Sequence, residues 1–171
     1  MSIESPFALP PLVTRAEARE QVWDYIVDTP TVADSPVRVL AHGKLLGLNS
    51  SSAWRIVKNG ISSKAIGPLS DYLGVGKGQV VDYLDLDRTT VSRRAAKDQL
   101  LPMHSAEGVL RLLELDEMAS DTFESEEDAA NWLRRPHPML DGESPLAATK
   151  TSFGAQRAKD ILVAVKYGGV V

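Results

Sequence analysis

The chain has 171 residues, a formal net charge of −4, a hydrophobic share of 43% and a charged share of 25%, which is the composition of an ordinary soluble protein with one or two small domains. Because it contains no Cys, disulfides and thiolate metal sites are excluded, and a reducing cytoplasm suits such a chain. No apolar run approaches the roughly 20 residues that cross a bilayer, and no basic leader precedes the short apolar run at the N-terminus, so we expect neither a membrane span nor a secretion signal.

The charge is unevenly distributed. Residues 54–104 hold 8 basic and 5 acidic side chains, whereas residues 105–143 hold 3 basic and 11 acidic ones. A polyanion would therefore be attracted to the middle of the chain only. Random scatter of charge over short segments is the alternative.

The first sixty residues predict an N-terminal extension that is partly helical. Residues 1–13 are rich in Pro and are expected to be irregular. Thr14 and Glu17 have the spacing of a capping box and open a helix that runs to about Val27. A linker at 28–37 follows, and then a helix around Val39 to Leu46 and a helical turn at Ala53 to Lys58.

From Ile61 onward the pattern is almost wholly helical, and no convincing alternating strand is present. Ser125 and Ser144 are predicted N-caps, the latter followed by Pro145 at the first helical position. The fold class is therefore all-α. The helices expected before residue 121 lie at about Ser63–Leu73, Lys77–Leu84, Arg88–Gln99 and Ser105–Ser120.

Residues 77–97 fit a helix-turn-helix. Val80, Val81 and Leu84 would line the inner face of the first helix, Leu86 would lie in the turn, and Val91 would anchor the second helix. Hydroxyl and long cationic side chains are the types that reach base edges and phosphates in the major groove. Such side chains on the exposed face of the second helix are Arg88, Thr89, Ser92, Arg93 and Lys97.

Some residues of this segment depart from the usual motif. Asp85 occupies a turn position where Gly is common, and Arg94 occupies a position that is often apolar. Asp82, Asp85 and Asp87 would weaken the affinity for phosphate. An amphipathic helix pair with a merely solvated basic face therefore stays open as the alternative to DNA binding.

Signals for catalysis, nucleotides or metals are weak. The glycines of residues 74–78 lack the spacing of a phosphate-binding loop and more simply make a turn between helices. The three His residues show no metal-ligand spacing, and no nucleophilic triad stands out. We expect no catalytic residue, metal or cofactor, although an enzyme that uses Tyr83 or His104 stays open.

The helix predicted at 105–120 carries an apolar face too broad for a lone surface helix, so this face is either core or the seam of a dimer. A homodimer is expected in any case, because one helix-turn-helix rarely binds a half-site tightly alone. Trp132 is expected to anchor the packing of the C-terminal part and to border an interface.

The last helix, predicted at Phe153 to Lys166, has an inward stripe that includes Ile161 and Leu162 and ends at Gly168 and Gly169. Lys166, Tyr167 and the slim Gly-Gly segment could enter a partner's pocket. An ordinary helix C-cap, with Gly168 in the left-handed conformation, is compatible with the same residues.

Two segments resemble the MbcA/ParS/Xre antitoxin family. The Thr-rich start and paired Arg of the sequence RTTVSRR are similar to the recognition helix of Xre-type regulators. The C-terminal part matches the family's domain in the order Trp132, Pro136, Pro138, Leu140, Gly142, Pro145, Thr151, Gly154, Ile161-Leu162 and Gly168-Gly169. The resemblance spans about residues 61–171 and leaves the first sixty residues uncovered.

The resemblance implies an antitoxin that neutralises a RES-domain toxin, an enzyme that depletes NAD, by covering its active site, and that binds the promoter of its own operon. It implies three segments: the extension 1–60, a helix-turn-helix domain with a dimerisation helix at 61–123, and a toxin-binding domain at 124–171. A stand-alone transcriptional repressor is the alternative.

The resemblance also implies site residues. The DNA-recognition role falls on Thr89, Thr90, Ser92, Arg93 and Arg94, beside the exposed cations Arg88 and Lys97. The residues implied in toxin binding, together with Trp132, are Arg157, Lys166, Tyr167, Gly168, Gly169, Val170 and Val171.

Overall fold

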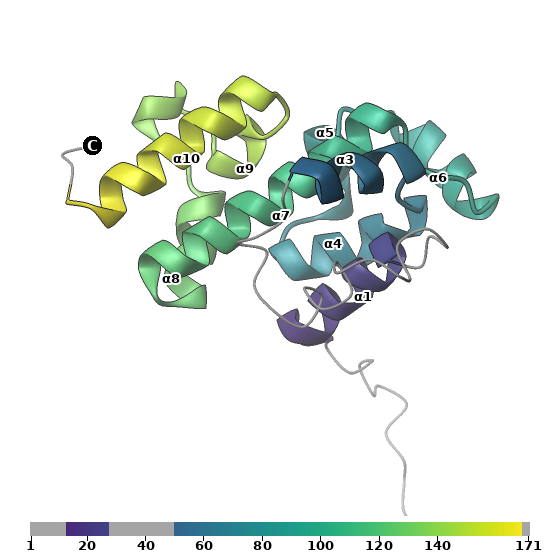
Figure 1. Ribbon diagram of the computed structural model, residues 1–171, viewed down its shortest axis with the longest axis horizontal. Coiled ribbons are helices and arrows are strands. Elements are labelled where there is room, and N and C mark those ends of the chain that lie inside the picture. The colour runs from purple at the N-terminus through teal and green to yellow at the C-terminus, as the bar shows by residue number, and fades with distance from the viewer. Residues whose placement is uncertain (1–12, 28–49, 169–171) are drawn as a thin grey trace, which may run out of the picture.

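The computed structural model describes residues 13–27 and 50–168, and these residues confirm the all-α prediction (Figure 1). The one extended feature among them is an isolated antiparallel bridge between Ser62 and Leu100. The predicted helix at Val39 to Leu46 and the linker at 28–37 lie outside the described residues. The helices are α1 (Arg15–Val27), α3 (Ser50–Asn59), α4 (Ile66–Leu73), α5 (Lys77–Tyr83), α6 (Arg88–Ala96), α7 (Met103–Phe123), α8 (Glu126–Arg134), α9 (Pro145–Ala148) and α10 (Ser152–Lys166), with 3-10 turns η1 (Ser63–Ala65) and η2 (Pro138–Leu140).

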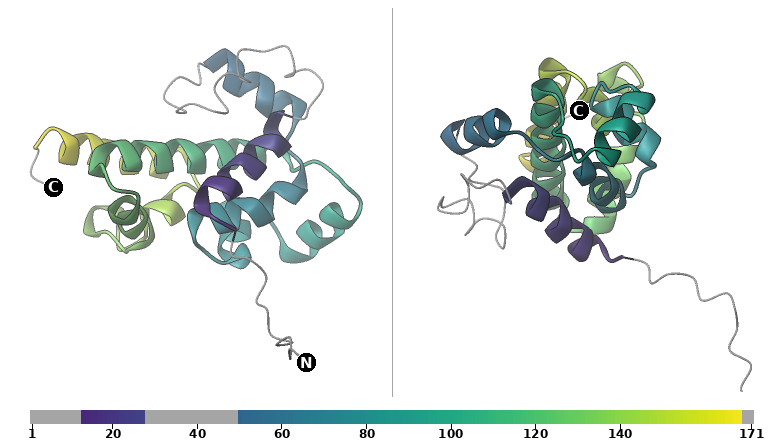
Figure 2. Two further views of the ribbon diagram at one scale, coloured as in Figure 1. Left: turned by 90° about the horizontal axis from the view of Figure 1, so that it is seen from below. Right: turned by 90° about the vertical axis from the view of Figure 1, so that its right-hand side faces the viewer.

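Helix α7 is the axis of the molecule. Helices α8 and α10 pack along it at one end, while α1, α4, α5 and α6 gather at the other end (Figures 1 and 2). Leu112, Leu113 and Leu115 of α7 are fully buried. The broad apolar face of this helix is thus covered by other helices of the same chain and belongs to the core.

The local capping signals of the sequence are confirmed. The backbone N–H of Thr14 donates to Glu17 Oε2 at 2.7 Å, and the N–H of Glu17 donates back to Thr14 Oγ1 at 3.2 Å. The N–H and the hydroxyl of Thr14 both donate to the Glu17 carboxylate, and these two bonds lower its pKa. Ser125 and Ser144 accept from the N–H groups of Asp128 and Ala147, so both cap the helices that they precede.

An ion pair fastens α1 to the core. Arg15 donates to both carboxylate oxygens of Asp116 on α7, at 2.7 and 2.8 Å, and to the backbone carbonyl of Tyr72 on α4 at 3.0 Å. The hydroxyl of Tyr72 donates to the same carboxylate at 2.5 Å. Burial and the charge of Asp116 raise the pKa of Tyr72. A second pair joins Arg19 to Glu117 at 3.0 Å.

The helical part of the N-terminal extension therefore belongs to the folded body. Ala18, Val22, Trp23 and Ile26 of α1 are buried in a cluster that continues to Leu162 of α10. The boundaries predicted at residues 60 and 123 stay predictions, since one core crosses both. Among the described residues, no helix combines the length and hydropathy that crossing a bilayer requires.

Candidate partner-binding surfaces

Helices α5 and α6 form a pair joined by residues 84–87. As the sequence predicts, Val80 and Leu84 are buried, whereas Leu86 in the turn and Val91 on α6 are half-buried against the core. The turn places Asp85 at φ +53°, in the left-handed region. Asp tolerates this region better than most residues, so the departure from Gly is compatible with a tight turn.

Helix α6 lies on the surface with none of its residues fully buried. Thr90 is half-buried, and its N–H donates to Asp87 Oδ2 at 2.8 Å, which caps the helix and lowers the pKa of Asp87. One short exposed helix and its end thus carry the cationic and hydroxyl side chains predicted for DNA contact. The exposed ones are Arg88, Thr89, Ser92, Arg93 and Lys97.

Arg94 differs from its neighbours. It is half-buried, and its guanidinium donates from Nη1 to the carbonyl of Leu100 at 3.0 Å. This bond folds the side chain back onto the turn that follows α6. The structure therefore gives Arg94 a contact within the chain, and its role in DNA binding stays a prediction.

At the other end of the molecule, Trp132 on α8 is the centre of an aromatic group. Its ring lies 5.9 Å from that of Phe123 and 6.1 Å from that of His137, measured between ring centroids. It is half-buried against the core. The predicted packing role of Trp132 is confirmed, and its predicted contact with a partner is untested.

Helix α10 is two-sided. Its inward stripe, which includes Ala158, Ile161 and Leu162, is buried, as predicted. Its outward side presents two large aromatic residues, Phe153, which is 88% exposed, and Tyr167, which is 79% exposed. Sequence reasoning did not single out Phe153 as a site residue. The position of Phe153 outside the apolar stripe of the helix is the sequence feature that indicates its exposure.

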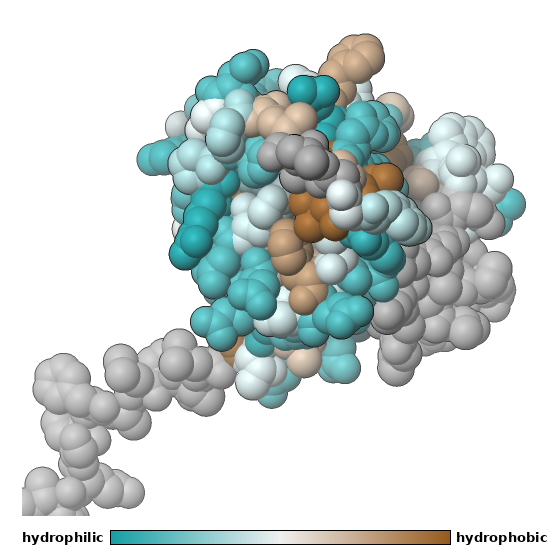
Figure 3. All heavy atoms as spheres, turned by 90° about the vertical axis from the view of Figure 1, so that its left-hand side faces the viewer, coloured by the Kyte–Doolittle hydropathy of each residue, from teal (hydrophilic) through white to brown (hydrophobic). Residues whose placement is uncertain are grey.

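The end of α10 holds most of the residues predicted to block a toxin. Lys166 forms an ion pair with Asp121 of α7, which raises the pKa of Lys166, while Tyr167 points into solvent. Gly168 has φ +73°, the predicted left-handed C-cap conformation. Gly169, Val170 and Val171 lie outside the described residues. Viewed from this end, the surface has a small apolar area among hydrophilic side chains (Figure 3).

Arg157, one turn after Phe153 on α10, lies against η2. Its Nε donates to the carbonyl of Met139 at 3.5 Å, and Met139 itself is exposed. Loop 137–143 is closed by His137, whose backbone N–H donates to the carbonyl of Glu143 at 2.9 Å. Arg157 and Met139 thus extend the surface around the start of α10 rather than its end.

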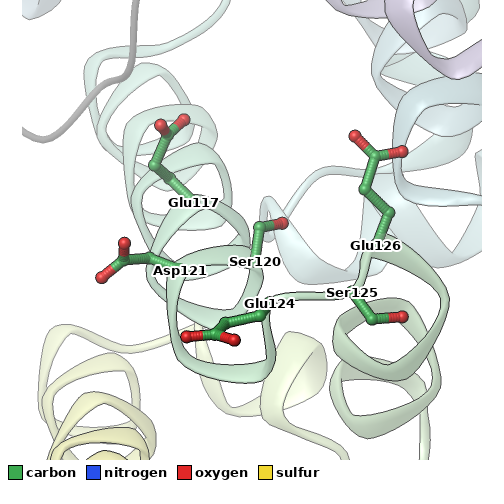
Figure 4. Close-up of a pocket in the computed structure, with 6 residues that line it drawn as sticks. All are labelled: Glu117, Ser120, Asp121, Glu124, Ser125 and Glu126. Atoms are coloured by element: carbon green, nitrogen blue, oxygen red, sulfur yellow. The ribbon is translucent and has the colours of Figure 1, made fainter.

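An acidic cavity of about 470 Å³ lies where α7 passes into α8 (Figure 4). It is lined by Glu117, Ser120, Asp121, Glu124, Ser125 and Glu126. Three of these carboxylates already have cationic partners, because Arg19 pairs with Glu117, Lys166 with Asp121, and Arg15 Nε lies 3.8 Å from Glu126 Oε2. No group of side chains in the described ranges has the composition and geometry to hold a metal ion.

Comparison with known proteins indicates a role for the end of the molecule that carries α8–α10. Residues 118–168 match the family model described as the antitoxin Xre/MbcA/ParS C-terminal toxin-binding domain. The chain is also similar to the Prs ADP-ribosylating antitoxin of Sphingobium sp. (strain YBL2). The two are 28% identical over 122 residues, which are 66% of this chain and 77% of that relative.

The helical domain formed by the end of α7 together with α8, η2, α9 and α10 is thus the part that binds a toxin, and the chain is a toxin-binding antitoxin. Residues 118–168 thus resemble the C-terminal toxin-binding domain of the Xre/MbcA/ParS antitoxin family. The matched range includes Trp132, Arg157, Lys166, Tyr167 and Gly168.

Proposed function

We propose that this antitoxin neutralises a RES-domain toxin by covering its NAD-binding active site with the end of α10, and that it represses its own operon through α5 and α6. It acts in the cytoplasm as a binding protein, without a catalytic residue or cofactor. The observation that carries the proposal is the match of residues 118–168 to a toxin-binding domain whose last helix ends in an exposed Tyr167.

The identity of the toxin's substrate rests on two supports. The family resemblance of the C-terminal part implies a RES-domain partner. The name of the Sphingobium relative associates that protein with ADP-ribosylation, which is a reaction that uses NAD. Both supports point to a partner whose pocket binds a dinucleotide, and an aromatic ring can stack in such a pocket.

Replacing Tyr167 by Ala is expected to abolish neutralisation while leaving the fold intact, because the ring is 79% exposed and contributes little to the core. Phe153→Ala is the matched control, since Phe153 is also a highly exposed aromatic residue and lies at the opposite end of the same helix. Growth of cells that co-express the neighbouring toxin gene with each variant measures neutralisation.

Restored growth with Phe153→Ala but not with Tyr167→Ala would support blocking by the end of α10. The reverse result would place the toxin contact at the start of α10 and around Met139. If the neighbouring gene is not toxic alone, or if it stays toxic beside the unaltered chain, the antitoxin–toxin pairing is wrong. Substitutions are preferable to a truncation near Glu124, because the truncation would remove α8 and α10, which pack against α7 and share its core.

The proposal of DNA binding rests on the α5–α6 pair. Its buried face, its tight turn at Asp85 and its exposed cationic second helix are compatible with a helix-turn-helix and support this proposal. The chain as a whole is acidic, so the attraction of phosphate is confined to this end. We propose that the protein binds as a homodimer, because two half-sites raise the affinity of a short helix-turn-helix.

Replacing Arg93 by Ala is expected to weaken binding to the DNA upstream of the gene by about 5- to 150-fold, since a base contact by Arg contributes about 1–3 kcal/mol. Neutralisation of the toxin should be unchanged, because Arg93 lies on α6, outside the matched toxin-binding domain. Electrophoretic mobility shift with the promoter duplex measures the first effect. Equal loss of both activities would contradict separate binding surfaces.

A further inference from the structure

Three carboxylates lie beside the start of the proposed recognition helix, where they would repel DNA phosphates. Asp82 is on the exposed side of α5, Asp85 is in the turn, and Asp87 directly precedes α6. Asp87 is accounted for by its bond from the N–H of Thr90. Asp82 and Asp85 do not cap α6. The proposed function does not explain why these two carboxylates form an acidic edge beside the cationic surface.

The toxin-binding domain supplies a cation to this edge. Lys150, in the connection between α9 and α10, places its Nζ 3.4 Å from Asp82 Oδ1 and 3.5 Å from Asp85 Oδ1. The two carboxylates raise the pKa of Lys150. One ammonium group thus lies between two carboxylates from different elements, and it comes from a residue more than sixty positions further along the chain.

The backbone that carries Lys150 is firmly held. Arg111 of α7 donates from Nε to the carbonyl of Thr149 at 2.9 Å and from Nη2 to the carbonyl of Lys150 at 3.5 Å. Thr149 is fully buried, and its hydroxyl donates to the carbonyl of Leu146 at 2.7 Å. The backbone at Lys150 is therefore held by α7 and α9 and is not part of a free loop.

We propose that Lys150 is a positioning residue for DNA binding: from the toxin-binding domain, it neutralises Asp82 and Asp85 and so sets the affinity of the α5–α6 pair for DNA. The inference rests on the proposed DNA-binding function and goes beyond it, because it assigns control of that function to a residue in another part of the chain. Lys150 acts through the two carboxylates and does not itself contact phosphate.

The size of the effect follows from Coulomb's law with screening. An exposed carboxylate about 10 Å from a phosphate is separated from it by one Debye length at an ionic strength of about 0.1 M, so its repulsion is modest and grows as salt is lowered. Leaving the two carboxylates without their cation near several phosphates should lower DNA affinity by about 3- to 10-fold at low salt.

The experiment is a mutant cycle in the full-length protein. Binding to a duplex of the DNA upstream of the gene is measured by fluorescence anisotropy for wild type, Lys150→Met, Asp82→Asn with Asp85→Asn, and the triple variant. Met keeps the length of the Lys stem, and Asn tolerates the left-handed conformation of residue 85. Lys159→Met is the control of equal charge, since Lys159 pairs with Glu114 of α7 at 2.5 Å and not with the α5–α6 pair.

We expect Lys150→Met to weaken binding by about 3- to 10-fold in the wild-type background and by less than about twofold when both Asp residues are Asn. Lys159→Met should leave binding unchanged. The loss could instead persist in the Asn background, together with a slope of log K against log salt concentration that is smaller by about one. This result would mean that Lys150 contacts phosphate directly, and it would overturn the inference. An equal loss in Lys159→Met would overturn it as well, by showing a general effect of net charge.

Neither of those outcomes contradicts the proposed DNA-binding function, because the wild-type protein binds the duplex in both cases. If the wild-type protein does not bind the duplex even at low salt, the DNA-binding function itself is wrong, and the role of Lys150 falls with it.

Discussion

Replacing Arg15 by Ala is expected to lower the free energy of unfolding by about 3–5 kcal/mol, because it leaves the charge of Asp116 buried without its cation. The Asp116 side chain is only 2% exposed, and Arg15 supplies two of its hydrogen bonds. Urea unfolding followed by circular dichroism measures the change. Because α1 is fastened to α4 and α7 through this group, the loss should appear in the main unfolding transition.

A double replacement is the control for this prediction. Arg15→Met together with Asp116→Asn removes both charges, and Asn can still accept the hydroxyl of Tyr72. The double variant should be more stable than Arg15→Ala, because its interior contains no unpaired charge. If Arg15→Ala unfolds at the same urea concentration as wild type, the ion pair does not hold α1 in solution.

Replacing Gly154 by Ala is expected to destabilise the protein by about 2–3 kcal/mol, although Ala is the better helix former. A Cβ at residue 154 would lie 2.1 Å from the carbonyl oxygen of Ala148, and this atom belongs to backbone that cannot move aside as a side chain can. Helix α10 would have to shift away from α9. The shift should lower both the thermal midpoint and the affinity for toxin.

Gly67→Ala is the matched control. Gly67 is also helical, and apart from its chain neighbours a Cβ there would meet nothing closer than 3.7 Å, at the side chain of Lys77. This replacement should cost less than about 1 kcal/mol, because the helix propensity of Ala offsets part of the crowding between its Cβ and the ring of Pro68. Similar thermal midpoints for the two variants would show that α9 and α10 approach less closely than the structure indicates.

The features that could be predicted correctly from the sequence depend on residues close together in the chain. The caps at Thr14, Ser125 and Ser144 each depend on residues within three positions of one another, and the buried stripe of α10 depends on helical periodicity. Such features need no knowledge of the tertiary fold. The same holds for the inner face of the α5–α6 pair.

Most of the features that escaped prediction join distant segments. Arg15 and Asp116 are 101 positions apart, and Lys150 and Asp82 are 68 positions apart, so no spacing rule connects them. The helical pattern marks Arg94 only as a polar residue at an often apolar position. Its bond to the carbonyl of Leu100 depends on how the chain turns after α6. Pairing of charges across helices follows from packing, which one sequence does not specify.

The length of α7 has a geometric consequence for the partners. A helix of 21 residues is about 30 Å long, at 1.5 Å per residue. Its first residues follow the turn after α6, and its last turns pair with the end of α10 through Asp121. Helix α7 thus acts as a spacer between the proposed DNA and toxin surfaces. A large partner bound at one end would leave the other accessible, so one antitoxin molecule could hold toxin and operator at the same time.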